Sequence, residues 1–459
     1  NGEAEAARLF PDALWVPYID PGYTLAVEMK EILSRCKAER GSVAKVLLLE
    51  SHGIFVAADT IEEIDSIYQS MVAAVVAEYQ EKGIAMELAT REPNAETVRT
   101  QAPRLRQLLS DGEFRRHVTA GAGFTVCSAP PTPDHVVYAK SIGYSGEFTA
   151  EGLAAFRAET GYLPTILTAE DGTVFAVGSD YAGTGLALEA AENAALVVQL
   201  SAAFGGPRYL EGREREFIEQ WEVESYRKKL AQGGGVKRLS GRVAIVTGAA
   251  QGFGYGIAEE LIAQGATICI ADINLEGAQA AADKLNAANG RTAAFAVAVN
   301  IADEDSVFAM VDAVAKAVGG LDLLVCNAGV VRAGSVKEIS LKDWQFVTDV
   351  NYTGYFLCVK AAAPVMAAQI VDGEGEWSDI VQISSKSGLQ GSNKNGAYAG
   401  SKFGGIGLTQ SFALELVTDS IKVNSVCPGN FFDGPLWSDP ERGLFVAYLK
   451  TGKVPGAET

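Results

Sequence analysis

Tyr398 and Lys402 are spaced so that they could act together on a proton. They stand four residues apart in Tyr398-Ala-Gly-Ser-Lys402, so in a helix they lie on one face, one turn apart. A tyrosine hydroxyl is a poor base at its ordinary pKa of about 10, and a nearby ammonium favours the phenolate and lowers that pKa. Such a pair can move a proton to or from the oxygen of an alcohol or a ketone.

A glycine-rich turn that could hold a dinucleotide lies earlier in the chain. Gly248-Ala-Ala-Gln-Gly-Phe-Gly254 directly follows the apolar run 243–247 and opens a helical pattern. The N-terminus of a helix holds a pyrophosphate through free N–H groups and its positive dipole end, and glycines let the backbone approach closely. We therefore expect this turn to bind a cofactor. The residues predicted to do so are Gly248, Gln251, Gly252, Phe253 and Gly254.

A carboxylate at the end of the next apolar run predicts the type of dinucleotide. Asp272 comes 24 positions after Gly248 and is placed to accept hydrogen bonds from the ribose hydroxyls of adenosine. It would repel a 2′-phosphate, and no Arg or Lys stands beside it in the sequence. The sequence therefore favours NAD over NADP.

The elements that must position these residues form a regular alternation. Apolar strands are predicted at 243–247, 267–271, 293–299, 321–326, 379–383 and 421–426, with helical patterns between them. Continuous apolar strands separated by helices predict a parallel sheet covered on both faces, which is a doubly wound α/β fold. A serine pair, Ser384 and Ser385, ends the fifth strand, at the edge where sites on such sheets lie.

Together these motifs resemble the short-chain dehydrogenase/reductase family, with its Rossmann domain, over nearly all of residues 238–459. The resemblance rests on Thr247-Gly-x-x-x-Gly-x-Gly254, Asn327-Ala-Gly329, Asn351, Ser385, Tyr398-x-x-x-Lys402 and Pro428-Gly429.

This resemblance implies roles for further residues. The family spacing to the tyrosine selects Ser385 over Ser384 to hold the substrate oxygen, and Asn351 would anchor a water beside Lys402. Asn300-Ile301 departs from the acidic residue that the family commonly places against adenine. The cofactor residues that follow are Asp272, Ile273, Asn300, Ile301, Asn327, Ala328 and Gly329 toward the adenosine, and Tyr398, Lys402, Pro428 and Gly429 toward the nicotinamide.

Three consecutive glycines within residues 231–238 mark a linker between two units. We place an N-terminal unit at 1–232 and the dehydrogenase-like unit at 237–459. In the N-terminal unit, 45–57 predicts two strands around a Ser-His-Gly turn, with a helix capped by Asp59 or Thr60, and 164–201 repeats that plan.

His52, in Glu50-Ser-His-Gly53, and the segment Trp15-Val-Pro-Tyr-Ile-Asp-Pro-Gly22 resemble the class II aldolase/adducin family. The resemblance implies an α/β domain in which His52 ligates a divalent metal such as Zn²⁺. A catalytic zinc needs three protein ligands, and the His-x-His that supplies the others in that family does not occur in this sequence. The alternative is a turn histidine packed beside Gly53.

The two resemblances in this order are similar to the bacterial bifunctional class II aldolase/short-chain dehydrogenase proteins. They imply an oxidoreductase that acts on a small carbohydrate-like substrate: a sugar, a polyol or a sugar phosphate. The N-terminal unit would then be a metal-dependent aldolase or a scaffold for oligomerisation. Family members are commonly homodimers or homotetramers, so we expect an oligomer.

Composition limits the remaining possibilities. The 459 residues carry a net charge of −19, which argues against nucleic-acid partners, and no apolar run is long enough to span a membrane. Six scattered cysteines without a CxxC pair predict reduced thiols in a cytoplasmic protein. We expect both ends of the chain to be incomplete, since the sequence begins within a helical pattern and stops after the predicted substrate loop.

Overall fold

The computed structural model describes residues 2–110, 116–220, 237–430, 438–441 and 443–450. Within these ranges no helix combines the length and the apolar character needed to cross a bilayer. The six cysteines are all unpaired thiols, four of them buried. The predicted linker at 231–238 lies almost wholly outside the described residues.

The C-terminal half is built on one six-stranded sheet, as the sequence predicts. Its strands are β8 (Val243–Thr247), β9 (Thr267–Asp272), β10 (Ala294–Ala298), β11 (Leu323–Cys326), β12 (Ser378–Ile383) and β13 (Ile421–Val426). They follow the order β10-β9-β8-β11-β12-β13, and every neighbouring pair is parallel. This confirms the parallel α/β fold.

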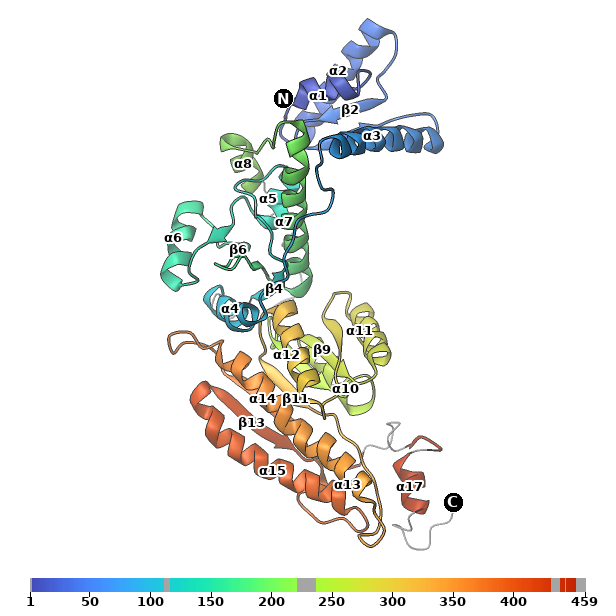
Figure 1. The fold of residues 1–459 in the computed structure, drawn as a ribbon, viewed down its shortest axis with the longest axis vertical. Helices are drawn as coiled ribbons and strands as arrows, with labels where there is room; N and C mark the ends of the chain where they lie inside the picture. The colour runs from blue at the N-terminus through green and yellow to red at the C-terminus, as the bar shows by residue number, and fades with distance from the viewer. Residues whose placement is uncertain (1, 111–115, 221–236, 431–437, 442, 451–459) are drawn as a thin grey trace.

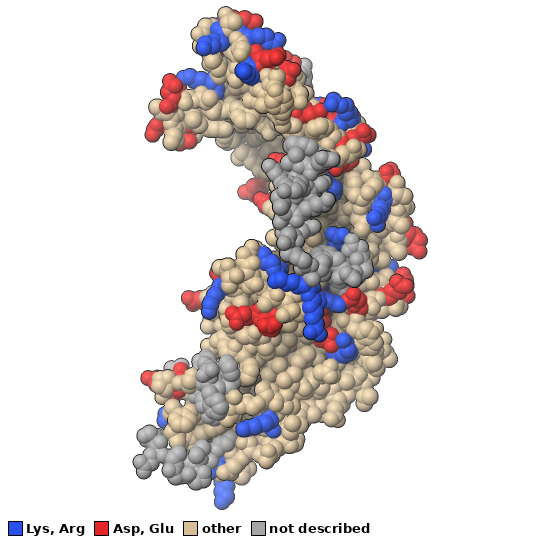
Figure 2. All heavy atoms as spheres, turned by 180° about the vertical axis from the view of Figure 1, so that it is seen from behind, with Lys and Arg blue, Asp and Glu red and all other residues tan. Residues whose placement is uncertain are grey.

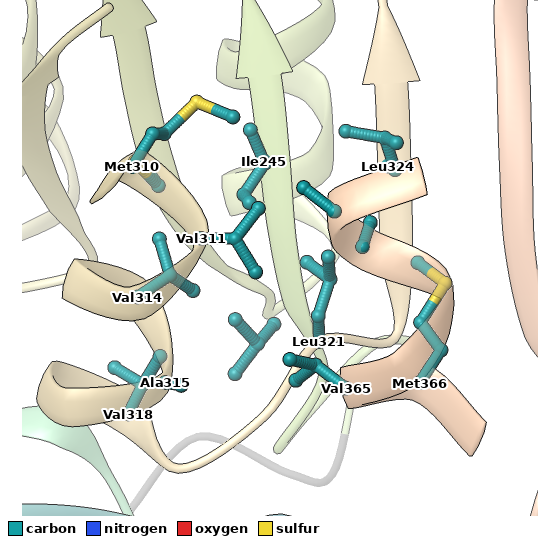
Figure 3. Close-up of a cluster of buried hydrophobic side chains, with 14 of the residues drawn as sticks. Ile245, Met310, Val311, Val314, Ala315, Val318, Leu321, Leu324, Val365 and Met366 are labelled. Atoms are coloured by element: carbon teal, nitrogen blue, oxygen red, sulfur yellow. The ribbon is translucent and has the colours of Figure 1, made fainter. Parts of the chain in front are cut away.

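Helices cover both faces of this sheet (Figure 1). They are α10 (Gly252–Ala263), α11 (Leu275–Asn289), α12 (Glu304–Val318), α14 (Gly354–Ala367) and α15 (Gly396–Leu416). Two further helices, α13 (Leu341–Thr348) and α17 (Leu444–Lys450), belong to the same half. Side chains alternate along a strand, so β8 sends Ala244 and Val246 toward α10 and α11, and Val243 and Ile245 toward α12 and α14. Figure 3 shows Ile245 among residues of α12 and α14.

The N-terminal half contains two smaller sheets. One has the order β1-β2-β3, from β1 (Leu14–Val16), β2 (Val46–Leu49) and β3 (Gly53–Val56). The other has the order β4-β7-β6-β5, from β4 (His117–Gly121), β5 (Tyr144–Ser145), β6 (Ile166–Thr168) and β7 (Val174–Gly178). The helices are α1 (Gly2–Leu9), α2 (Tyr23–Arg40), α3 (Ile61–Glu81), α4 (Ala95–Leu108), α5 (Pro133–Ala139), α6 (Ala150–Thr160), α7 (Tyr181–Ser201) and α8 (Gly212–Glu219).

The repeated plan of the N-terminal half is present in both places. An antiparallel hairpin, β2–β3, is followed by α3, and a second hairpin, β6–β7, is followed by α7. Thr60, rather than Asp59, caps α3, because its side chain accepts a hydrogen bond from the Glu63 amide.

The two halves meet at the amino ends of the large sheet, where α4 and β4 pack against α12 (Figure 1). The Arg106 side chain lies in this contact at 1% exposure and pairs with Asp322, which immediately precedes β11. Val118 of β4 packs so closely on Gly319 that a Cβ there would lie 2.8 Å from the Val118 carbonyl oxygen. Catalytic residues of parallel sheets lie at the carboxyl ends, so this contact leaves that edge uncovered.

Candidate active site

The glycine turn between β8 and α10 has the conformation that a phosphate-binding loop requires. Gly248 and Gly252 have φ values of +66° and +60°, in the left-handed region that favours glycine. A Cβ at Gly254 would lie 2.7 Å from Asn327 Nδ2, so only glycine fits there. Gln251 precedes α10 without capping it through its side chain, and the exposed Phe253 lies in its first turn. The first turn of α10 is thus available to an anion.

Asn327 supports the turn from behind. Its Nδ2 donates to the carbonyl oxygens of Thr247 and Gly248 at 2.9 and 3.0 Å. The Ala328 amide donates to the Thr247 hydroxyl at 3.1 Å. The Asn327 side chain therefore fixes the loop, and that Asn327, Ala328 and Gly329 line the adenosine side stays a prediction.

Asp272 ties the end of β9 to the same loop. Its carboxylate accepts hydrogen bonds from the amides of Ala250 and Asn274 at 3.1 and 3.0 Å. In the described parts of the chain no Lys or Arg forms an ion pair with it. The neighbouring Ile273 side chain is 76% exposed.

The other two residues expected near adenine differ in exposure. Asn300 is exposed, and its side-chain oxygen accepts a hydrogen bond from the Ala302 amide at 3.2 Å. Ile301 is buried, with its side chain packed against Gly354. Because that side chain points into the core, only the backbone of Ile301 is left to face a cofactor.

Tyr398, Lys402 and Ser385 come together at the carboxyl edge of the sheet. Tyr398 and Lys402 lie in the first turns of α15, with Lys402 Nζ 5.7 Å from the centre of the Tyr398 ring. Ser385 follows β12, and its side chain lies close enough to the Tyr398 hydroxyl to influence the pKa of that group. Lys402 is 5% exposed and donates from Nζ to the Ile383 carbonyl oxygen at 2.8 Å.

Burial governs the pKa values of this pair. It lowers the pKa of Lys402 to about 8, because the charged form loses its hydration. It also raises the pKa of Tyr398, an effect that the Ser385 side chain opposes. The lowering of the Tyr398 pKa by Lys402 therefore stays a prediction, because burial has the larger effect here and the Lys402 ammonium donates to the Ile383 carbonyl oxygen.

Asn351 lies in a π-helical turn, η2 (Asp349–Thr353), between α13 and α14. Its side chain is 3% exposed; Oδ1 accepts from the Val330 amide, and Nδ2 donates to the Val330 carbonyl and the Ser401 hydroxyl. These bonds join the loop after β11 to α15 and leave the side chain positioned beside Lys402. A cavity of about 10 Å³, close to the space of one water, is lined by Asn351 and Lys402 among others.

The segment after β13 closes the site from the other side. The Pro428 carbonyl oxygen accepts a hydrogen bond from the Lys386 amide at 3.0 Å, which places Pro428 and Gly429 next to Ser385. Burial raises the pKa of Tyr448 in α17, and the nearby Tyr398 adds to this rise. Tyr448 is not predicted from the sequence, because a single tyrosine after a predicted loop carries no spacing signal.

The three histidines lie in separate places. His52 Nε2 is 2.7 Å from the Ile19 carbonyl oxygen, and its ring stacks on Tyr18. His117 lies in the contact between the two halves, and His135 hydrogen-bonds Asn193. In the described residues no group of three His, Cys, Asp or Glu side chains could hold a metal. The described neighbours of His52 therefore do not fit a zinc site.

Comparison with known proteins agrees with the architecture. The family model described as short chain dehydrogenase matches residues 242–437. Sorbitol-6-phosphate 2-dehydrogenase of Escherichia coli is 36% identical over 196 residues, which are 43% of this chain and 74% of that protein. D-threitol dehydrogenase of Mycolicibacterium smegmatis is 38% identical over 219 residues, 47% of this chain and 81% of that protein.

A third relative extends over both halves. The uncharacterized oxidoreductase YuxG of Bacillus subtilis is 26% identical over 499 aligned positions, covering 96% of this chain and 70% of that protein. A parallel sheet, a glycine turn and a Tyr–Lys pair at the carboxyl edge define a nucleotide-dependent oxidoreductase. The chain belongs to the short-chain dehydrogenase/reductase family, whose members use NAD or NADP, and it is an oxidoreductase that acts on CH–OH groups.

Proposed function

We propose that the chain is an NAD-dependent dehydrogenase that interconverts a secondary alcohol and a ketone on a sugar, polyol or sugar phosphate. The observation that carries this proposal is the meeting of Ser385, Tyr398 and Lys402 at the carboxyl edge, next to the glycine turn. The names of two relatives, a sorbitol-6-phosphate dehydrogenase and a D-threitol dehydrogenase, support the substrate class.

Each side chain at this edge has a separate role in the proposed reaction. A nicotinamide cofactor, held with its pyrophosphate at Gly248–Gly254, would supply or accept the hydride at the substrate carbon. In alcohol oxidation, Tyr398 takes the hydroxyl proton while Ser385 holds the same oxygen; in ketone reduction, Tyr398 returns the proton. Lys402 favours the phenolate once the site is closed to water, and Asn351 fixes the loop beside it. A water in the small cavity would connect Lys402 with solvent.

The proposed preference for NAD rests on Asp272. Its carboxylate stands at the end of β9 with no cationic partner among the described residues, so a 2′-phosphate would meet a negative charge there. The expected consequence of Asp272→Ala is a rise of KM for NAD together with a gain in the use of NADP. Steady-state rates with both cofactors test it; an unchanged ratio of NADP to NAD efficiency would contradict the assignment.

The proposal is tested by following NADH absorbance with a panel of sugar alcohols, aldoses, sugar phosphates and hydroxy acids. Tyr398→Phe is the matched variant, since it removes only the hydroxyl. Turnover on one substrate class should fall at least 100-fold in Tyr398→Phe. Turnover that survives this change would refute the proposed mechanism.

For the N-terminal half we propose a supporting role, which its buried contact with the large sheet favours. Metal-dependent aldol cleavage stays a prediction that rests on the resemblance around His52. Assembly into a homodimer or homotetramer likewise stays a prediction. Sedimentation of the whole chain would measure the oligomeric state.

A further inference from the structure

We infer that Lys386 recognises a phosphate group on the substrate, so that a phosphorylated polyol or sugar is preferred over its neutral parent. This inference rests on the proposed dehydrogenase function and names the substrate class of that same site. Lys386 immediately follows Ser385 in the chain.

The backbone around Lys386 is held firmly at the catalytic edge. Lys386 begins a short 3-10 turn, η3 (Lys386–Gly388), and its amide donates to the Pro428 carbonyl oxygen at 3.0 Å. Beneath it, Gly388 packs on α15 so closely that a Cβ would lie 3.0 Å from the Lys402 carbonyl oxygen. The Lys386 Cα is about 3.8 Å from that of Ser385, and a flexible four-carbon stem carries its ammonium outward from there.

The Lys386 ammonium is available to a ligand. The side chain is exposed, and it forms no ion pair or side-chain hydrogen bond with any residue in the described ranges. Two other cations on the same half of the molecule are engaged: Arg332 lies 3.8 Å from Asp343, and Lys422 lies 3.2 Å from Asp379.

The loops beside Lys386 carry more basic than acidic side chains. Residues 327–340 after β11 and 384–395 after β12 include four Lys and Arg side chains and one acidic residue, Glu338, in a chain whose net charge is −19. Asp272 ends β9 on the same edge, three strands away from β12. The loops touch, since the Gly334 amide donates to the Lys394 carbonyl oxygen at 2.8 Å. Seen from behind, the lower half of the molecule also shows broad uncharged areas with few carboxylates, unlike the upper lobe (Figure 2). Such a field favours an anionic substrate and gives a neutral polyol no advantage.

The cofactor does not account for Lys386. Its pyrophosphate would lie at the glycine turn after β8, whereas Lys386 follows β12, and β11 separates these two strands. With neighbouring strands about 4.8 Å apart, the two positions are roughly 10 Å from each other across the sheet. An anion at Lys386 is therefore part of the substrate.

The test compares kcat/KM for a polyol phosphate and for the same polyol without phosphate. The wild-type chain should prefer the phosphate ester at least tenfold. Lys386→Gln should reduce that preference at least tenfold, mainly through KM, because one charge-assisted contact is lost, and Lys386→Arg should keep most of it. Lys422→Gln, which removes an exposed lysine on β13, serves as the matched control and should leave the preference unchanged.

Three results would overturn the inference while the dehydrogenase function stands. The first is wild-type turnover of neutral polyols only. The second is an equal preference for the phosphate ester in Lys386→Gln and wild type. The third is a wild-type preference for a hydroxy carboxylic acid over the phosphate ester. Turnover that does not depend on Tyr398 would instead contradict the proposed function itself.

Discussion

Two buried cations, Arg106 and Lys402, lie at opposite edges of the same sheet and differ in the partners that compensate their charge. At the amino edge, Arg106 is matched by the Asp322 carboxylate, by Gln369 Oε1 at 2.6 Å and by the carbonyl oxygens of Gly241 and Arg116. At the carboxyl edge, Lys402 has one carbonyl partner and no carboxylate among the residues that the structure describes. The two side chains are 1% and 5% exposed, so burial alone does not distinguish them.

This difference indicates a structural role for the Arg106 charge and a role in proton transfer for the Lys402 charge. A buried charge is tolerated when partners replace its hydration, as they do around Arg106. Lys402 lacks such compensation, and burial lowers its pKa to about 8. Groups left in this state cluster at functional sites, where a proton must be released near the working pH.

The largest expected effect on stability comes from replacing Arg106, whose buried charge is compensated by its partners. Arg106→Met removes the nearer cation from the buried Asp322, which keeps only Arg242 at 3.6 Å as a described ion-pair partner, so the free energy of unfolding should fall by roughly 3–5 kcal/mol. Urea denaturation measures this loss. The double variant Arg106→Met/Asp322→Asn should cost less than the sum of the two single changes, and strict additivity would contradict the pairing.

A second prediction uses the pH dependence that Lys402 imposes. Its pKa is about 8 in the folded chain and near 10.5 when unfolded, so between these values the unfolded chain binds more protons. The free energy of unfolding contributed by this group therefore rises with pH from 8 to 10.5, and the burial penalty is complete below pH 8. That rise is on the order of 3 kcal/mol. Subtracting the unfolding curve of Lys402→Met from that of the wild type isolates it; an identical pH dependence in both would refute the shift.

The smallest expected effect comes from a second ion pair in the contact between the two halves. Arg99 makes a bidentate pair with Asp312 at 2.8 and 2.9 Å, but both side chains are about one-third exposed. Arg99→Gln should therefore lower the free energy of unfolding by less than about 1 kcal/mol. Urea denaturation beside Arg106→Met compares the two arginines directly, and equal losses would show that burial is not the deciding variable.

The sequence predicted what depends on local pattern. Alternation of apolar runs located the six strands of the large sheet, and glycine spacing located a turn that the positive φ of Gly248 and Gly252 confirms as left-handed. It also placed Tyr398 and Lys402 on one helix. These features follow from periodicity and backbone sterics within a few residues of one another.

What the sequence did not predict depends on contacts between distant segments. Arg106 and Asp322 are 216 positions apart, and nothing in either neighbourhood shows that they meet. The raised pKa of Tyr398 follows from burial by other elements, and the bonds from Asn351 to Val330 and Ser401 need the completed fold. Periodicity carries no information about such pairs.

The most direct test of the central claim, that Lys402 is kept uncompensated for catalysis, is the behaviour of Lys402→Met. NADH formation and urea denaturation would be measured on the same preparation at pH 7.5, with Arg106→Met alongside. The account predicts at least a 100-fold loss of turnover, with a free energy of unfolding equal to or above that of the wild type. A variant that keeps its turnover and loses stability as Arg106→Met does would show that Lys402 is a structural charge, and would contradict the account.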